Sequence, residues 1–448
     1  MSEANVYILG RHLTKSSILP KNTNQASGQE SFSLTSYSPS SPCSINTNSL
    51  YPNFTKINIP SDCVNYRKED VDVLTSAMTS HVDQVSIGSD FIMILLSDGS
   101  LYSMGINRPC HHLGFTDSSL NTFETAKVLY LNSLKGTPVK LIASGAYYTI
   151  LATRDDDLYG IGSNDYGQFH VNGSSSHKHN ATPYFINYGK KQGDKITHIA
   201  CCFSFSIIVT NGTELRLAGQ DWVTDGGSHN SYLVHSRHVA SNIFHTFKSP
   251  VQEVRAGAFH FVAVLKDGTV YGSGSNSREQ LGQSFTRNGI QQIALNHPLM
   301  TSACCGSDCC LLISNNGEIQ KLGESRYGFL EESLFKNLEN YKDATNIQMC
   351  EQLLGMIGKR GIHLRGNNNT FWIGNVDEEF CQVDLPFEAL FNTSVSHEYV
   401  GACARYYHIA FFLRYSKSVT KHFMFMKRRI NNFGLSDITV ITSSYGFY

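Results

Sequence analysis

The chain of 448 residues carries no excess of charge of either sign. It contains 36 Lys and Arg against 37 Asp and Glu, which gives a formal net charge of −1 at pH 7. Such a balance provides no overall basic field that would attract nucleic acid or an anionic membrane surface. The composition therefore gives no support to a function that depends on such a field.

Long apolar segments are also missing. The apolar runs are far shorter than the ~18 residues that a helix needs to cross a bilayer. The first residues, MSEANVYILGRH, lack the basic stretch and apolar core of a secretory signal. We therefore expect no membrane span and a cytoplasmic or nuclear location. The 12 cysteines are then expected to be free thiols in a reducing compartment.

Motifs that mark common catalytic sites are absent. The sequence has no Gly-x-Ser-x-Gly nucleophile elbow and no His-Glu-x-x-His zinc motif. Gly-x-Gly occurs at 272–274, but there it ends an expected strand that a loop follows, which is not the strand–loop–helix context of a phosphate-binding loop. We predict a protein that is not an enzyme and that needs no cofactor and no metal.

A strand pair joined by a tight turn recurs along the chain. Its clearest copy lies at 251–283, where an expected strand at 260–265 is followed by Asp267-Gly268 and a second strand at 269–273. Asp-Gly between two β-rich runs is the strongest short-range hairpin signal, because the turn needs positive φ and Gly adopts it without strain. One hairpin cannot bury its own apolar face in water, so the copies must pack on one another.

The second strand of each copy carries an apolar or aromatic pair followed by a glycine. After a first interval of 95 residues, these glycines are separated by 49 to 57 residues. A last apolar strand at 400–413 has no such partner after it, and the segment at 6–10 has no apolar strand before it. The seven glycines are Gly10, Gly105, Gly162, Gly219, Gly274, Gly323 and Gly374.

Repeats of about 50 residues that consist only of strands are typical of a β-propeller. We predict an all-β chain that forms a seven-bladed β-propeller closed by the N-terminal strand, with a few short helical insertions. Helical spacing of apolar residues places these helices at 67–80 and 329–344. The propeller is expected to span 1–413 with a mobile polar loop at 14–50, and a basic and apolar C-terminal extension to follow at 414–448.

Two copies depart from the regular pattern. The third carries an insert at 221–241 between its expected strands. The sixth is expected to turn at Asn367–Asn369, before the strand 370–374.

The best copies resemble a known repeat. The succession Gly-x-x-His, Asp-Gly, Val-Tyr, Gly-x-Asn, Gln-Leu-Gly over 257–282 is similar to the repeat of the regulator of chromosome condensation family, and LYGIGSNDYGQF at 158–169 matches it almost as well. In other copies Phe91, Tyr148 or Cys309 replaces the histidine. The repeat residues of the clearest copy are Gly257, His260, Asp267, Gly268, Gly274 and Gly282.

The resemblance implies a propeller that binds proteins. Members of the family exchange nucleotide on a Ran-type small GTPase while docked on chromatin, recognise substrates or partners for ubiquitin ligases or kinases, or organise trafficking and ciliary complexes. An exchange factor binds the nucleotide-free GTPase more tightly than the loaded form, so it needs no acid, base or nucleophile. We predict a monomeric interaction propeller that regulates a small GTPase, with a ubiquitin-ligase or trafficking adaptor as the alternative. Contact with nucleic acid or chromatin is left open.

The insert at 221–241 is the candidate partner-binding segment, since it could act as the wedge that such exchangers insert into the GTPase. A different class of function, hydrolysis or elimination at the bottom of the channel, would need carboxylates or histidines that converge there. The expected inner strands instead carry Ala, Ser, Cys and Gly. The candidate residues of the insert are Asp221, Trp222, Asp225 and Tyr232.

Adjacent cysteines at 304–305 and 309–310 raise the question of a metal site. Neighbouring residues in a strand point to opposite faces, so both members of a pair cannot readily face one metal. We expect these cysteines to pack as small apolar residues beside the channel. His260 is expected to form a hydrogen bond between neighbouring blades.

Overall fold

The computed structural model consists of strands, with 28 of them in the part of the chain that it describes. The described residues are 6–10, 55–57, 82–107, 109–114, 121–128, 134, 137–169, 179–223, 234–238, 240–283, 289–296, 299–324, 346–350, 353–359, 361–367, 380–387, 400–405 and 408–413.

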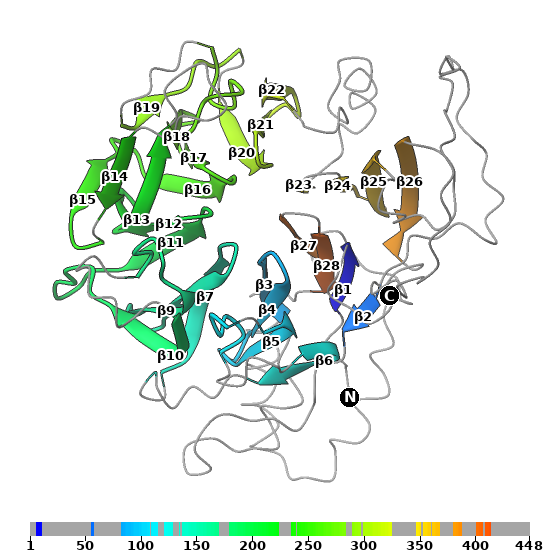
Figure 1. The fold of residues 1–448 in the computed structure, drawn as a ribbon. Helices are drawn as coiled ribbons and strands as arrows, with labels where there is room; N and C mark the ends of the chain where they lie inside the picture. The colour runs from blue at the N-terminus through cyan, green and yellow to red at the C-terminus, as the bar shows by residue number, and fades with distance from the viewer. Residues whose placement is uncertain are drawn as a thin grey trace, which may run out of the picture.

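The described strands form seven antiparallel sheets of three to five strands each. Figure 1 shows the sheets around a common centre, and the first strand of each sheet lies nearest to it. These first strands are neighbours around the ring, and the last of them contacts the first. The all-β propeller prediction is confirmed. The first strands are β3 (Val82–Ile87), β7 (Val139–Ser144), β11 (Ile196–Cys201), β16 (Val251–Ala256), β20 (Met300–Cys305), β23 (Asn346–Met349) and β27 (Val400–Arg405).

Six sheets continue outward with strands that follow in sequence, and in the seventh β27 and β28 are followed outward by β1 and β2. The second strands are β4 (Phe91–Leu96), β8 (Tyr148–Thr153), β12 (Phe205–Thr210), β17 (His260–Leu265), β21 (Cys309–Ser314), β24 (Leu353–Ile357) and β28 (His408–Leu413). The third strands are β5 (Leu101–Ile106), β9 (Leu158–Ser163), β13 (Glu214–Val223), β18 (Val270–Gly274), β22 (Ile319–Gly323), β25 (Gly361–Asn367) and β1 (Val6–Gly10). The outermost strands are β6 (Asn121–Val128), β10 (His179–Ile186), β14 (Val234–His238) with β15 (Ile243–Thr246), β19 (Gln291–Gln292), β26 (Phe380–Pro386) and β2 (Thr55–Ile57).

The N-terminal strand completes the sheet of the C-terminal hairpin. β1 pairs with β28 in antiparallel register, from Val6 opposite Phe412 to Gly10 opposite His408. β2 pairs with the other edge of β1. The segment at 6–10 thus takes the place of the third strand that the sequence lacks after 400–413.

The repeated glycine at the end of the third strand is required twice over. At the five such glycines from Gly105 to Gly323, φ lies between 76° and 130°, a region that residues with a Cβ rarely adopt. A Cβ there would also lie 2.2 to 2.5 Å from the carbonyl oxygen of the residue before the second strand. The repeat therefore keeps glycine because any side chain would push two strands apart.

The sixth sheet differs from the sequence prediction. Its third strand is β25, which begins at Gly361, so the turn expected at Asn367–Asn369 is wrong. Gly358 N donates to the Gly361 carbonyl at 2.9 Å, which closes a much earlier turn. Gly366 lies opposite Leu353, the place that the repeated glycine takes in the other sheets, and Gly374 lies outside the described residues.

The core consists of apolar clusters between neighbouring sheets. The second strands are buried on both faces, as in FIMILL at 91–96, and they read as continuous apolar runs for that reason. The first residue of these strands is often aromatic, and its ring reaches the next sheet. The Tyr148 hydroxyl, for example, contacts the carbonyls of Cys202 at 3.0 Å and Phe205 at 2.7 Å.

Replacement of Tyr148 by phenylalanine is expected to lower the free energy of unfolding by about 1–3 kcal/mol. Both carbonyls then lose the hydroxyl donor, although the Phe205 carbonyl keeps Cys202 N at 2.8 Å, and each lost hydrogen bond is worth about 0.5–1.5 kcal/mol. The ring itself fits, since Phe91 takes the same position in another sheet. Urea unfolding of both proteins measures the difference, and an unchanged midpoint would count against this inter-sheet link.

Several expected segments lie outside the described residues. They include the polar loop at 14–50, the helices at 67–80 and 329–344, and the extension at 414–448. In the described part of the chain, no helix has the length and apolar character needed to span a membrane.

Candidate protein-binding face

One end of the sheets carries the turns between first and second strands, and we call it the turn face. It includes the turns 88–90, 145–147, 202–204, 257–259 and 306–308. In all five of these turns the N–H of the first residue donates across the turn, for example from Gly257 N to the His260 carbonyl at 2.8 Å. The two residues between donor and acceptor in each turn therefore lie at the end of the sheet, outside its strand pairing.

Neighbouring turns are tied to one another through the backbone. Phe203 N donates to the Ala258 carbonyl at 2.7 Å, and Ser89 N donates to the Ala146 carbonyl at 3.0 Å. These hydrogen bonds join successive sheets, so the turns form a rigid surface instead of independent loops. Rigid scaffolds of this kind commonly present binding residues on their loops.

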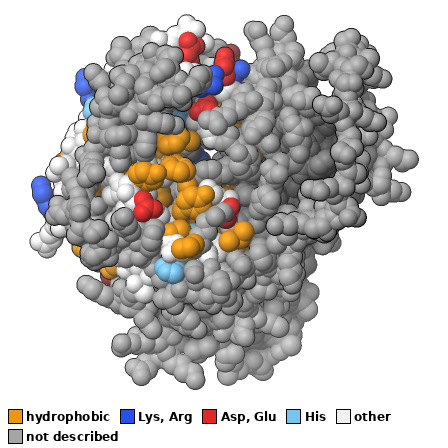
Figure 2. Space-filling model, in the orientation of Figure 1, with side chains coloured by type: hydrophobic (Ala, Val, Ile, Leu, Met, Phe, Trp, Pro, Cys, Tyr) orange, Lys and Arg blue, Asp and Glu red, His pale blue; other side chains and the backbone are white. Residues whose placement is uncertain are grey.

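Aromatic side chains from three consecutive sheets form a row on the turn face. The row consists of Tyr166, Phe203 and Phe259, with ring centroids 6.1 Å apart for the first pair and 5.5 Å for the second. All three are half-buried. None of the three was predicted as a binding residue from the sequence, although the repeat fixes the turns that carry Phe203 and Phe259. Figure 2 shows apolar side chains gathered near the middle of the viewed face, with lysines and arginines mostly toward its rim.

The insert of the third sheet begins as a hairpin that projects beyond the same face. Gly219 lies opposite Phe205, directly after the turn 202–204, yet β13 continues to Val223. It pairs there with β14, and Val223 lies opposite Val234. At ~3.3 Å per residue, this extension adds roughly 13 Å to the strand.

The candidate residues of the insert are divided by this hairpin. Asp221 and Trp222 lie in β13, opposite Ser236 and His235. Asp225 and Tyr232 lie between the two strands, outside the described residues.

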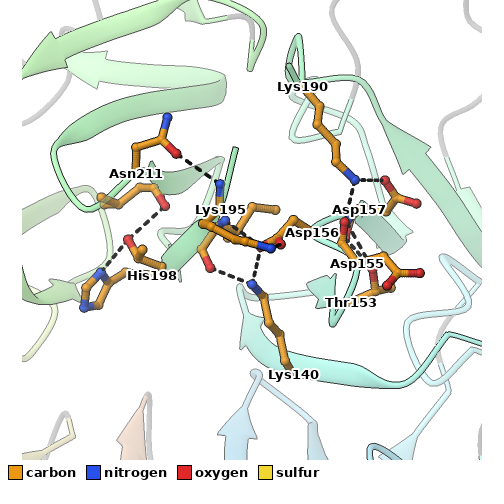
Figure 3. Close-up of polar contacts among 12 residues, drawn as sticks. Lys140, Thr153, Asp155, Asp156, Asp157, Lys190, Lys195, His198 and Asn211 are labelled. Carbon is orange, nitrogen blue, oxygen red and sulfur yellow. Dashed lines mark hydrogen bonds and ion pairs between the residues drawn. The ribbon is translucent and has the colours of Figure 1, made fainter. Parts of the chain in front are cut away.

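The opposite end of the sheets carries a buried ionic network (Figure 3). Asp156 stands in the turn between β8 and β9 with φ 63° and is only 1% exposed. Its carboxylate accepts hydrogen bonds from Lys140, from Lys195 at 3.1 Å and from Ile196 N at 2.8 Å. Burial raises the pKa of Asp156, but these hydrogen bonds and the Lys140 charge outweigh it, so the pKa lies below its ordinary value.

Neighbouring charges at this end are also matched within the protein. Lys190 pairs with Asp157 at 2.9 Å. Buried Arg216 donates to the carbonyls of Tyr188 at 3.0 Å and Ser241 at 2.9 Å. Burial and the nearby carboxylates, Asp156 first among them, raise the pKa of Tyr188 well above its usual range. Because these groups satisfy one another across two sheets, we assign the network to stability and not to ligand binding.

A third polar group lies between the fourth and fifth sheets. His260 Nε2 lies 3.0 Å from Cys310 Sγ, which confirms the predicted link between blades. Cys305 Sγ lies 3.1 Å from the same sulfur. Burial opposes ionisation of Cys305, but hydrogen bonds with Cys310 and His260 and the charges of His260 and Arg255 lower its pKa to about 6. The expectation of small apolar residues is met by Cys304 and Cys309, which lie in an apolar cluster, whereas Cys305 and Cys310 also make these polar contacts.

The comparisons with known proteins agree with this architecture. The family model described as "Regulator of chromosome condensation (RCC1) repeat" matches residues 139–168 and 251–280. The ultraviolet-B receptor UVR8 of Arabidopsis thaliana is 24% identical over 298 residues, which are 64% of this chain and 61% of the receptor. The E3 ubiquitin-protein ligase HERC2 of Homo sapiens is 28% identical over 242 residues, 52% of this chain and 5% of the ligase.

Two solved structures share the fold. Human WBSCR16 superposes with a TM-score of 0.61 at 14% identity, covering 92% of this chain and 99% of that one. Yeast RCC1 (Prp20), solved with Kap60, gives a TM-score of 0.54 at 14% identity and covers 79% and 83% of the two chains. The chain thus has the fold of a β-propeller, and two of its repeats match the RCC1 repeat. It spans 61% of the length of UVR8 and 5% of HERC2, so the activities of those whole proteins do not follow from the match.

Proposed function

We propose that the chain is a non-enzymatic interaction propeller that binds a protein partner through the turn face. The observation that carries this proposal is the aromatic row Tyr166–Phe203–Phe259 beside the projecting β13–β14 hairpin. Aromatic residues are enriched among the contacts that dominate protein interfaces, because they bury much apolar area with few rotatable bonds. The hairpin adds a protrusion beside this rigid apolar surface.

The partner that we propose is a small GTPase of the Ran type, with the protein acting as a nucleotide exchange factor. The matched family repeats and the protruding hairpin support this choice. The hairpin would enter the nucleotide-binding region of the GTPase, and tighter binding of the nucleotide-free state would release GDP. In this mechanism the propeller only binds the nucleotide-free GTPase more tightly than the loaded form. Aromatic contacts on the turn face are sufficient for that task, since no catalytic side chain is required.

The alternative is substrate recognition for a ubiquitin ligase. This alternative is favoured by the similarity to the E3 ubiquitin-protein ligase HERC2, although the matched segment covers only 5% of that ligase. In that case the turn face would bind a substrate, and the ligase would be a separate chain. Exchange assays separate the two functions, since a substrate adaptor does not accelerate GDP release.

Release of fluorescent GDP from a Ran-type GTPase tests the proposal. Substoichiometric wild-type protein is expected to accelerate release with turnover. The double change Phe203→Ala and Phe259→Ala should lower this activity by about 1,000-fold, since two aromatic contacts at the centre of an interface are worth ~2 kcal/mol each and each 1.4 kcal/mol is tenfold. Replacement of 222–235 by Asn-Gly, which keeps the pairing up to Asp221, should reduce it comparably.

A matched control is Phe185→Ala, which removes an aromatic side chain that is 49% exposed on an outermost strand. It should leave GDP release unchanged. Folded wild-type protein without any effect on release would overturn the exchange function. Retained partner binding by the turn-face variants would overturn the turn face as the binding surface.

The domain limits, the monomeric state and the cytoplasmic or nuclear location stay predictions. So do the partner-binding roles of Asp221, Trp222, Asp225 and Tyr232. A role for the basic extension at 414–448 and contact with chromatin also stay predictions.

A further inference from the structure

A cluster of metal-ligating side chains lies at the junction of two sheets, apart from the turn-face aromatic row. It consists of His260 at the start of β17 and of Cys305 and Cys310 on β20 and β21. One ligand atom of each residue lies within 4.8 Å of the others. His260 precedes Cys305 by 45 residues and Cys310 by 50 residues in the sequence. The three side chains meet because β17 packs against β20.

The strand register explains why the two thiols meet. Cys305 lies opposite Cys310, and Gly306 N donates to the Cys309 carbonyl at 2.9 Å. This makes Cys305 and Cys310 a non-hydrogen-bonded pair, in which the Cα atoms approach to ~4.5 Å and the side chains lie on the same face. Each adjacent cysteine pair therefore contributes one member to this cluster.

The other member of each pair belongs to a different environment. Cys304 and Cys309 pack with Leu311, Met349 and Leu354 in an apolar cluster on the opposite face of the sheet. The alternation of the strand thus separates two thiols beside an imidazole from two thiols in an apolar core. The chain itself supplies a matched pair of controls.

The imidazole of His260 is poorly satisfied by the protein. The ring is fully buried. Nε2 contacts the Cys310 sulfur, and Nδ1 has no hydrogen-bond partner among the described residues. A thiol is a weak hydrogen-bonding group, whereas Tyr148 at the same position finds two carbonyls. A buried imidazole whose main partner is a weakly bonding sulfur suggests that the imidazole and the sulfurs together bind a ligand.

We propose that His260 Nε2, Cys305 Sγ and Cys310 Sγ bind a thiophilic transition-metal ion, for which Zn²⁺ is the probe. Thiolate and imidazole are the ligands that Zn²⁺ prefers, and three protein ligands leave one coordination position for water or another donor. Both sulfurs bind the ion as thiolates, so binding releases to solvent the protons that the two thiols still carry. Cys305 is only partly buried, which gives the ion access to the cluster.

Zinc titration of the full chain tests this site. The protein is reduced with a phosphine, freed of metal with a chelator and titrated with Zn²⁺ against a chromogenic chelator. We expect one Zn²⁺ per chain with a Kd below about 1 µM, and Co²⁺ should produce a thiolate-to-metal charge-transfer band. The double change Cys305→Ala and Cys310→Ala should weaken binding at least ~100-fold, whereas Cys304→Ala with Cys309→Ala should change it less than about threefold.

His260→Phe keeps the test decisive if a cysteine variant fails to fold. Phenylalanine stands at this position in β4 and β12, so the variant is expected to fold and to lose only the nitrogen ligand. It should bind Zn²⁺ at least ~10-fold more weakly and should show a changed Co²⁺ spectrum. Absence of Zn²⁺ binding by folded wild type, or equal losses in the Cys304 and Cys309 variant, would overturn the site.

Discussion

Replacement of Gly274 by alanine is expected to lower the free energy of unfolding by more than about 3 kcal/mol. Its φ of 105° already costs a residue with a Cβ ~1–2 kcal/mol. A Cβ there would also lie 2.3 Å from the Phe259 carbonyl and 2.8 Å from His260 Cα, so the backbone of β17 would have to move. Overlap with backbone, unlike overlap with a flexible side chain, has no rotamer to relieve it.

Gly193→Ala separates the two causes. Gly193 has a φ of 90°, but a Cβ there would meet no described atom within 4 Å. This control should lose only the conformational contribution, about 1–2 kcal/mol. Urea unfolding of both variants measures the difference, and equal losses would show that the close approach to Phe259 has no effect.

Asp156→Asn is expected to destabilise the protein by about 3 kcal/mol. The change leaves Lys140 and Lys195 without the carboxylate that both of them contact, and removal of one partner from a buried ionic group typically costs ~3–5 kcal/mol. Lys195 is largely exposed and can turn to water, which places the expected loss at the lower limit. Asparagine tolerates the φ of 63°, so backbone strain does not confuse the result.

The contribution of Asp156 should depend on pH. Its pKa in the folded protein is lowered from 3.8, so the stabilisation is complete above that value and is lost as the pH falls through the lower folded value. The difference in unfolding free energy between wild type and Asp156→Asn should therefore shrink below about pH 4. The exposed Asp155→Asn is the control and should cost less than ~0.5 kcal/mol. A difference that is constant from neutral to acidic pH would contradict the ionic role.

The repeat pattern predicted the strands because its signals are local. Asp267-Gly268 marks a turn through its own backbone preferences, and this turn appears where it is expected, with positive φ at Gly268. The glycine after each third strand was also found from the sequence. Its reason, the close approach of a carbonyl, becomes visible only in the folded sheets.

The misplaced strand of the sixth sheet shows the limit of pattern matching. TFWIG at 370–374 has the composition of the repeat, but so does IHLRG at 362–366. The short turn closed by Gly358 and Gly361 makes 361–367 the third strand of this sheet. Strand register therefore selects the segment, and residue composition does not encode that register.

Residues that meet across sheets were equally beyond the sequence. Strand alternation correctly separated Cys304 from Cys305, yet it gave no way to bring Cys305 beside His260. The same holds for Phe203 and Phe259, whose rings meet across two sheets. Their distances depend on how neighbouring sheets pack, which no local signal encodes.

The pairing of β1 with β28 places the earliest and the latest strands of the ring in one sheet. During synthesis, residues 6–10 leave the ribosome while 408–413 have yet to be translated, so this sheet is completed after the others can have formed. Pairing β1 with β28 closes a loop of about 400 residues, whereas one repeat closes a loop of about 50. The longer loop costs about 2 kcal/mol more in chain entropy. Until then β28 presents an open edge, and the β1 of a second copy of the chain can pair with it. Crowded or rapid expression should therefore favour strand-exchanged dimers over the other forms of misassembly.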